Sequence, residues 1–386
     1  MSAVEKMTQQ LATPRPRSNT RRVLGAAAAI VATAILAAAC TPPPGGGSPP
    51  TSAPTTTTPV SDEPFTVVFV GDSEARMRGN TDAEIAAYVR NIAAYASTKS
   101  AYFAYGDGTH RIDPELVILG GDISADRGTS VGADLPLWQP LYDAGIAFIA
   151  GFGNHDWEPV TFADGSAGYS VAGHLSNEST TGFTRETYRR SAQLSSDFTY
   201  REVAPSSTHG PVTFHSSYKG VEIVNFNTFL YQPSYRYPDG WPLSCNLLAG
   251  GAGCQIFASA EPQITRMSEL FSRRENSTAL FVQHYPLTTD DGWWDDHGAS
   301  GTTVAQKKDR LLGMMSQFDH VALLAGHNHS PLQRSHQYGG RTFQEYVAPY
   351  FGGNNLDDPT QGGAFLALLV SPTDGILEVV TIPAGA

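Results

Sequence analysis

Five short apolar runs in this chain are each followed at once by polar side chains that can bind a metal ion. The runs lie at 67–70, 116–119, 146–149, 279–282 and 321–325, and the groups behind them are Gly71-Asp72-Ser73-Glu74, Gly120-Gly121-Asp122, Gly151-Phe152-Gly153-Asn154-His155-Asp156, Gln283-His284-Tyr285-Pro286 and Gly326-His327-Asn328-His329. Short β-rich runs that alternate with amphipathic helices predict an α/β fold. Because the carboxyl ends of strands in such sheets line one crevice, we expect the five groups to converge.

Local turn and cap signals support this division into strands and helices. Two capping boxes predict where helices begin. One pairs Thr81 with Glu84, and the other pairs Thr303 with Gln306. Toward the C-terminus, runs at 365–370 and 376–382 flank Pro372-Thr373-Asp374-Gly375. That arrangement predicts a β-hairpin.

Taken singly, each polar group has an ordinary explanation. Gly-Gly-Asp is also typical of a turn, and a lone His284 is also typical of a hydrogen-bonded surface residue. The groups Gly153-Asn154-His155-Asp156 and Gly326-His327-Asn328-His329 are rarer, because average residue usage produces either one on the order of once in a few hundred chains of this length. Their joint occurrence, each behind a strand-like run, indicates a functional site.

In this order the groups resemble the signature of the calcineurin-like metallophosphoesterase superfamily: Asp-x-His, Gly-Asp, Gly-Asn-His-Asp/Glu, His and Gly-His-x-His. The resemblance spans about residues 65–370, and four of the five blocks match fully. It implies an α/β fold in which two mixed β-sheets pack as a sandwich flanked by helices. It also implies metal-dependent hydrolysis of phosphate esters, by a phosphomonoesterase or a phosphodiesterase.

The resemblance further implies a site for two metal ions. Asp122 would bridge both ions, Asp72 and His329 would hold the first, and Asn154, His284 and His327 would hold the second. A shared carboxylate keeps two cations ~3.5–4 Å apart and leaves room for a bridging water, which becomes the attacking hydroxide. His155, next to Asp156, is expected to stabilise the transition state or to protonate the leaving oxygen.

Glu74 departs from the family pattern, which usually has His at this position. Residues two apart point to the same side of an extended chain, so Glu74 and Asp72 can reach one ion. A carboxylate there favours Mn or Fe over Zn. In the alternative, Glu74 points elsewhere and water completes the coordination, so the identity of the metals among Mn, Fe and Zn stays open.

The N-terminal segment predicts export. Residues 1–39 combine a basic stretch ending in Arg21 and Arg22 with an uncharged apolar run, and Cys40 follows three alanines. This order resembles a lipoprotein signal peptide and is also similar to twin-arginine signals, so we expect lipid on Cys40. An uncut membrane anchor is the alternative. Residues 40–64 then predict a disordered Pro/Thr/Gly tether, and 65–386 the metallophosphoesterase domain.

The predicted export and the negative net charge of the chain limit which substrates and partners it can have. In an oxidising compartment, Cys245 and Cys254 predict a local disulfide, with two unrelated buried thiols as the alternative. Without residues 1–39 the chain has 20 basic and 36 acidic residues, a net charge of −16, which argues against a nucleic-acid substrate. We therefore expect a small extracytoplasmic phosphate ester, at the outer face of the cytoplasmic membrane or in the periplasm. A catalytically weak surface lipoprotein that binds phosphate or metal is the alternative.

Overall fold

The computed structural model describes residues 62–75, 79–123, 134–153, 159–161, 167–169, 180–203, 213–226, 267–268, 271, 277–287, 303–353 and 363–385. The chain divides into two compact units, Met1–Thr57 and Thr58–Ala386, and every described residue belongs to the second. The predicted signal peptide, the lipid site at Cys40, most of the tether, and both Cys245 and Cys254 lie outside the described residues. Among the described helices, none combines the length and the apolar character needed to span a bilayer.

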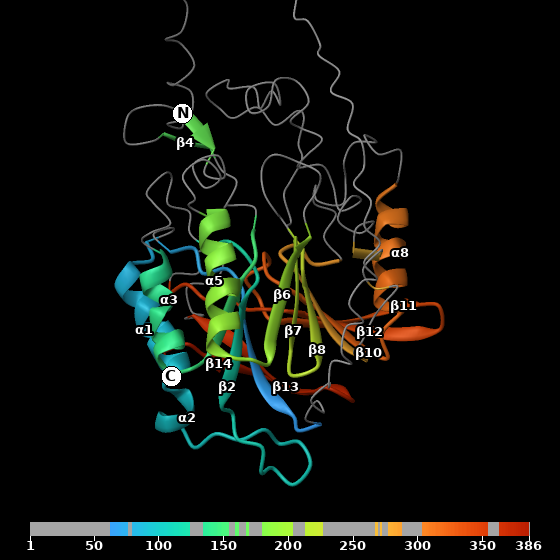
Figure 1. Ribbon diagram of the computed structural model, residues 1–386, viewed down its shortest axis with the longest axis horizontal. Coiled ribbons are helices and arrows are strands. Elements are labelled where there is room, and N and C mark those ends of the chain that lie inside the picture. Colours follow the sequence, from blue (N-terminus) through green and yellow to red (C-terminus); the bar gives the residue numbers. More distant parts are fainter. Residues whose placement is uncertain are drawn as a thin grey trace, which may run out of the picture. The chain divides into compact units, whose positions relative to one another are not determined.

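The first sheet has five strands in the order β14-β13-β1-β2-β3 (Figure 1). Their bounds are β1 Phe65–Val70, β2 Pro114–Leu119, β3 Ala147–Ala150, β13 Ala364–Ser371 and β14 Gly375–Pro383. Strands β1, β2 and β3 are parallel, whereas β13 runs antiparallel to both β1 and β14. The β13–β14 pair is the hairpin that the turn sequence predicted.

The second sheet has seven strands in the order β11-β12-β10-β9-β8-β7-β6. Their bounds are β6 Phe198–Val203, β7 Thr213–Tyr218, β8 Val221–Asn225, β9 Thr278–Gln283, β10 His320–Ala325, β11 Leu332–Tyr338 and β12 Arg341–Val347. Strands β8, β9, β10 and β12 are parallel, and the outer pairs are antiparallel. A separate pair joins β4 (Pro159–Thr161) to β5 (Ala167–Tyr169).

Alternation along the strands places the core between the two sheets. In β9, Leu280 and Val282 join the apolar cluster that contains β1, β2 and β3, while Ala279 and Phe281 join a second cluster on the opposite face. Side chains in a strand point to opposite faces with period two, so the central strands are buried on both sides. The two mixed sheets therefore pack face to face. This confirms the fold that the resemblance to calcineurin-like metallophosphoesterases implied.

Helices cover the outer faces (Figure 1). The described helices are α1 Asp82–Ala93, α2 Tyr95–Thr98, α3 Asp134–Asp143, α5 Thr180–Leu194 and α8 Val304–Met315. Helices α1, α3 and α5 bury apolar side chains in the cluster of the first sheet, and α8 buries Leu311, Leu312 and Met315 in the cluster of the second. Both predicted capping boxes are formed, at the starts of α1 and α8.

The carboxyl ends of the central strands meet through backbone hydrogen bonds between the loops that follow them. Glu74 N–H donates to Asp122 O at 2.8 Å, which joins the loops after β1 and β2. Gly326 N–H donates to His284 O at 2.9 Å, which joins the loops after β10 and β9. Between the two sheets, His284 Nδ1 lies 3.2 Å from Gly120 O, so the polar groups behind these four strands converge as predicted.

Candidate metal centre

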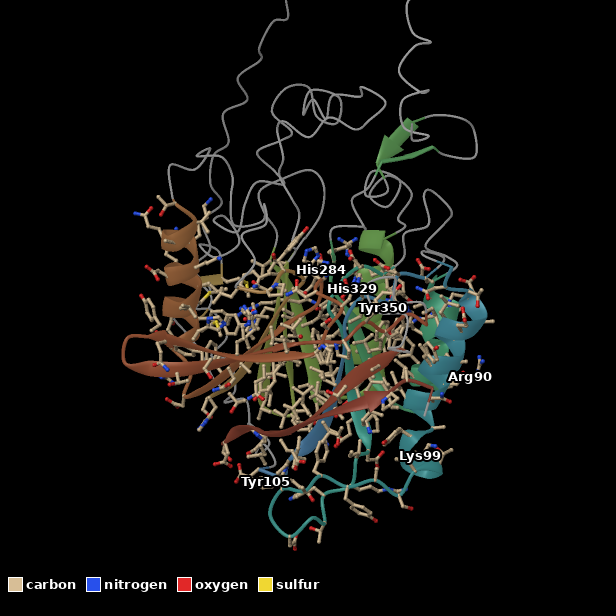
Figure 2. All side chains as sticks on the ribbon, turned by 180° about the vertical axis from the view of Figure 1, so that it is seen from behind. Arg90, Lys99, Tyr105, His284, His329 and Tyr350 are labelled. Atoms are coloured by element: carbon tan, nitrogen blue, oxygen red, sulfur yellow. The ribbon has the colours of Figure 1, made fainter. Side chains whose placement is uncertain are left out.

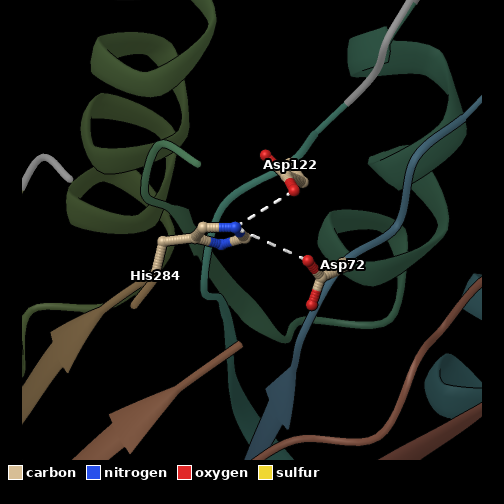
Figure 3. A group of neighbouring side chains, drawn as sticks. All are labelled: Asp72, Asp122 and His284. Atoms are coloured by element: carbon tan, nitrogen blue, oxygen red, sulfur yellow. Dashed lines mark ion pairs between the residues drawn. The ribbon is translucent and has the colours of Figure 1, made fainter. Parts of the chain in front are cut away.

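Three buried side chains from three different strand ends form the centre of the site (Figure 3). Asp72 follows β1, Asp122 follows β2 and His284 follows β9, and at most 1% of each residue is exposed. One ligand atom from each lies within 4.8 Å of the others. The alternative in which His284 is a surface residue is therefore wrong.

The histidine of one sheet faces the carboxylates of the other (Figure 3). His284 Nε2 lies 3.0 Å from Asp122 Oδ2 and 3.6 Å from Asp72 Oδ1. His329, in the loop after β10, places its Nε2 3.5 Å from the same Asp72 Oδ1. One carboxylate oxygen of Asp72 thus lies between two imidazole nitrogens. Figure 2 shows His284, His329 and Tyr350 gathered at one end of the sheets.

Glu74 adds a third buried carboxylate to this group. It is fully buried, and its Oε1 lies 3.9 Å from His329 Nε2. Its other oxygen, Oε2, accepts a hydrogen bond of 2.8 Å from the Tyr350 hydroxyl. The Glu74 carboxylate therefore lies beside His329 and is held there by Tyr350, although the left-handed backbone at Glu74 (φ 38°) is not the extended chain that the spacing argument assumed.

Backbone contacts hold the ligand atoms in orientation. His284 Nδ1 lies 3.2 Å from Gly120 O, and because a carbonyl only accepts, this nitrogen carries the hydrogen. The lone pair is then on Nε2, the nitrogen that faces the carboxylates, as in metal-binding histidines whose second nitrogen donates to a carbonyl. On the other side, His327 N–H lies 2.8 Å from Asp72 Oδ2 and 3.2 Å from Asp72 Oδ1, so this amide holds the carboxylate through both oxygens, with the shorter contact to Oδ2.

Four site residues have left-handed backbone, with φ of 38° at Glu74, 49° at Asp122, 68° at His327 and 54° at His329. Within the described residues, only Lys219 shares this feature among non-glycines. This region costs energy for residues with a β-carbon, and such conformations cluster at functional sites because the surrounding fold imposes them.

The set of donors fits a metal site. Carboxylate oxygens and imidazole nitrogens are the ligands of Mn, Fe and Zn. Buried carboxylates close to one another repel and lose hydration, and a cation between them removes both costs. Gly326 adds to the fit, because a β-carbon there would lie 2.9 Å from Asp72 Oδ2 and 3.3 Å from His284 Nδ1.

The remaining predicted residues are placed less centrally or are not described. The His327 ring is half-buried and lies 5.2 Å from the His284 ring and 4.3 Å from the Tyr285 ring, measured between centroids. Asn154, His155 and Asp156 lie outside the described residues, although the preceding Gly153 touches Asp122. Of the nine predicted site residues, six are described and gather here.

Two residues of this site carried no sequence signal. Tyr350 follows β12, and Asn80 precedes α1; both are buried, and Asn80 Nδ2 donates to the Tyr350 hydroxyl at 2.6 Å. Neither stands in a recognisable motif. They are 270 positions apart, so only the tertiary structure brings them together.

Comparisons with known proteins identify no relative by sequence. No protein-family model and no curated protein matches the chain. Among solved structures, the protein TT1561 of Thermus thermophilus aligns with 83% of this chain and 98% of its own, at 10% identity and a TM-score of 0.39. The Thermus thermophilus sulfate thiohydrolase SoxB aligns over 85% and 58%, at 10% identity and a TM-score of 0.35.

A conserved uncharacterized protein of Streptococcus pneumoniae, described as a predicted phosphoesterase, aligns over 84% of this chain and 92% of its own, at 11% identity and a TM-score of 0.26. At this level of similarity, these structures assign no activity to the chain. The chemistry of the site rests on its own side chains.

Proposed function

We propose that this protein is a metal-dependent hydrolase of small phosphate esters, of the calcineurin-like type. The observation that carries the proposal is the position of Asp72 Oδ1, which lies 3.6 Å from His284 Nε2 and 3.5 Å from His329 Nε2. Asp122 Oδ2 lies 3.0 Å from the same His284 nitrogen. Buried carboxylates after strands of one sheet that face imidazole nitrogens after strands of the other are suited to hold cations, and phosphate esters are anions that such cations bind.

The residues proposed to hold two ions follow the ordered motifs. One ion would lie with Asp72, Glu74 and His329, the other with Asn154, His284 and His327, and Asp122 would be shared. The chemistry that metal ions supply in such a site is polarisation of the phosphoryl oxygens and a lower pKa for the water that attacks phosphorus. Mn, Fe and Zn all fit this mixed set of ligands.

The chain's own groups orient the site and move the proton. The amide of His327 orients the Asp72 carboxylate, and the carbonyl of Gly120 fixes the tautomer of His284. We assign proton transfer to His155, with Asp156 beside it to orient the imidazole and stabilise its charged form. A protonated imidazole at that place would donate its hydrogen to the departing ester oxygen.

We further propose that the protein works outside the cytoplasm, attached by lipid on Cys40 and stabilised by a disulfide between Cys245 and Cys254. The sequence order at residues 21–40 and the two closely spaced cysteines support this placement. A net charge of −16 without residues 1–39 disfavours long polyanions, whereas a small ester is held by the local positive charge of metal ions.

The test is metal analysis of the purified full-length chain together with turnover of aryl phosphate monoesters and diesters. Metal content near two per chain with turnover supports the proposal, whereas bound metal without turnover identifies a phosphate- or metal-binding lipoprotein. Asp72→Asn should lose metal affinity by more than ~100-fold, beyond the usual effect of an outer contact. Asp309→Asn, an exposed carboxylate on α8, is the matched control and should leave both measurements unchanged.

A further inference from the structure

We propose that Tyr350 and Asn80 form a brace that holds the Glu74 carboxylate in the metal site and thereby tunes which metal ion binds beside Asp72 and His329. The inference rests on the proposed function, because it concerns the metals of that site. It links Glu74, the residue that departs from the family pattern, to two specific side chains. These two residues, called the Glu74 brace below, act by positioning another side chain.

The direction of each hydrogen bond in the brace follows from its chemistry. Asn80 Nδ2 donates to the Tyr350 hydroxyl oxygen at 2.6 Å and to the Glu74 carbonyl oxygen at 3.3 Å, and the carbonyl identifies this atom as the amide nitrogen. The hydroxyl oxygen accepts from Asn80, so its single hydrogen is available to Glu74 Oε2 at 2.8 Å. The donor chain therefore ends on a carboxylate.

Burial makes this chain of donors a strong constraint. No more than 4% of Glu74, Asn80 or Tyr350 is exposed. In a region of low dielectric constant, a hydrogen bond to an ionised group is stronger than one between neutral groups. With Oε2 tied to Tyr350, the carboxylate presents Oε1 toward His329 Nε2, 3.9 Å away.

The backbone around Tyr350 also holds the other two members of the same ligand set. Tyr350 N–H donates to His329 O at 3.3 Å, and the adjacent Phe351 N–H donates to Asp72 O at 3.1 Å. The Tyr350 ring lies 4.7 Å from the His329 ring between centroids. Tyr350 and Phe351, after β12, thus contact the residues proposed to hold one ion. A change at Tyr350 should therefore alter the binding of that ion more than the binding of the other.

Gly352 shows how closely the brace is packed. A β-carbon at this position would lie 2.4 Å from Asn80 Nδ2 and 2.5 Å from Tyr350 Cζ, closer than real contacts. Only glycine therefore fits while the amide and the phenol keep their positions. This close packing restricts the rotation of both side chains, so Glu74 meets a fixed donor.

The chemical consequence is a preference among metals. A carboxylate that is oriented toward the site offers a hard oxygen ligand, which suits Mn or Fe, whereas an imidazole-dominated set suits Zn. If Tyr350 or Asn80 is replaced, Glu74 can turn away from the site. The imidazole of His329 then makes up a larger share of the remaining ligands. The preference should then shift away from Mn and toward Zn.

The experiment uses Tyr350→Phe in the full-length chain, stripped of metal and titrated with Mn and with Zn by calorimetry. We expect ~10–100-fold weaker Mn binding at one of two sites, the usual effect of losing an outer hydrogen bond, with a smaller change for Zn. Tyr218→Phe is the matched control, because it removes a hydroxyl from a buried tyrosine at the opposite end of the second sheet. Asn80→Ala tests the brace from its other residue, and circular dichroism establishes that each variant is folded.

A double-mutant comparison separates the brace from a general packing effect. In a Glu74→Ala background, Tyr350→Phe should cause no further loss of Mn affinity, because its effect passes through Glu74. Additive losses would overturn the proposal, and so would unchanged Mn binding in folded Tyr350→Phe and Asn80→Ala. A wild-type chain that binds no Mn or Zn would instead refute the proposed function itself, so the two failures are distinguishable.

Discussion

Gly153 lies against Asp122 so closely that no β-carbon fits between them. A β-carbon built on Gly153 would lie 2.1 Å from Asp122 Oδ1 and 2.4 Å from the Asp122 amide nitrogen. The loops after β2 and β3 therefore touch through a glycine, and the carboxylate proposed to bridge two ions is fixed by that contact. In the sequence, Asn154 and His155 directly follow Gly153.

Gly153→Ala should therefore damage the metal site while leaving the sandwich folded. The added methyl group has to displace the Asp122 carboxylate or the β3 loop, and we expect at least ~10-fold weaker metal binding. Calorimetric titration with Mn measures the change. Gly385→Ala is the control, because a β-carbon there meets only Tyr88 at an ordinary 3.8 Å. Wild-type affinity in Gly153→Ala would show that the contact is not needed.

Asp122→Asn should raise the stability of the metal-free protein and remove its response to metal. Neutralising Asp122 relieves its repulsion with the neighbouring buried Asp72, and we expect a gain of about 1 kcal/mol, within the ~0.5–2 kcal/mol that single stabilising substitutions commonly contribute. The wild type should gain about 2.7 kcal/mol when free Mn is 100 times its Kd. Urea unfolding at pH 8, with a chelator and then with Mn, compares the two. An equal gain from Mn in both chains would place the metal elsewhere.

Glu345 supports the loop that carries His284. It is fully buried in β12, its Oε1 accepts the Leu287 N–H at 2.6 Å, and its Oε2 lies 2.8 Å from His336 Nε2. Glu345→Ala should lower the free energy of unfolding by about 3 kcal/mol, because buried partners lose their acceptor. Glu202→Gln, which breaks a pair at the surface, should cost less than ~1 kcal/mol. Urea denaturation measures both, and equal losses would contradict the assigned role.

His155→Asn tests proton transfer separately from metal retention. We expect both metal ions to stay bound while kcat falls by roughly 100-fold or more, the usual contribution of general acid–base catalysis. The loss should be larger for alkyl than for aryl phosphates, because poor leaving groups need the proton most. Steady-state kinetics on both ester types, with metal analysis, measures this. A metal-free variant would assign His155 to the ligand set instead.

Cys40→Ser tests attachment to the membrane. If lipid is added at Cys40, the variant should accumulate as an uncut precursor and take up no labelled fatty acid. Labelling in the expressing bacterium, followed by electrophoresis, compares it with the wild type. Replacement of Cys245 by Ser serves as the control, because it removes a cysteine without touching the signal. Unchanged labelling of Cys40→Ser would end the idea.

Much of the fold was predictable because its signals are local. A capping box at Thr81 and Glu84 lies within one helical turn, and a turn at 372–375 lies within one hairpin. Asp72, Asp122 and His284 could be proposed as metal ligands from the sequence, because each closely follows an apolar run. Their convergence followed from the general geometry of strand ends.

Neighbouring positions in the sequence were enough to propose which residues supply the ligands, because motif chemistry and strand period are local. How these side chains are held depends on contacts between distant segments. Tyr350 donates to Glu74 across 276 positions, and Gly153 lies against the carboxylate of Asp122. Such contacts depend on how two sheets pack, and no local pattern encodes which distant side chains that packing brings together.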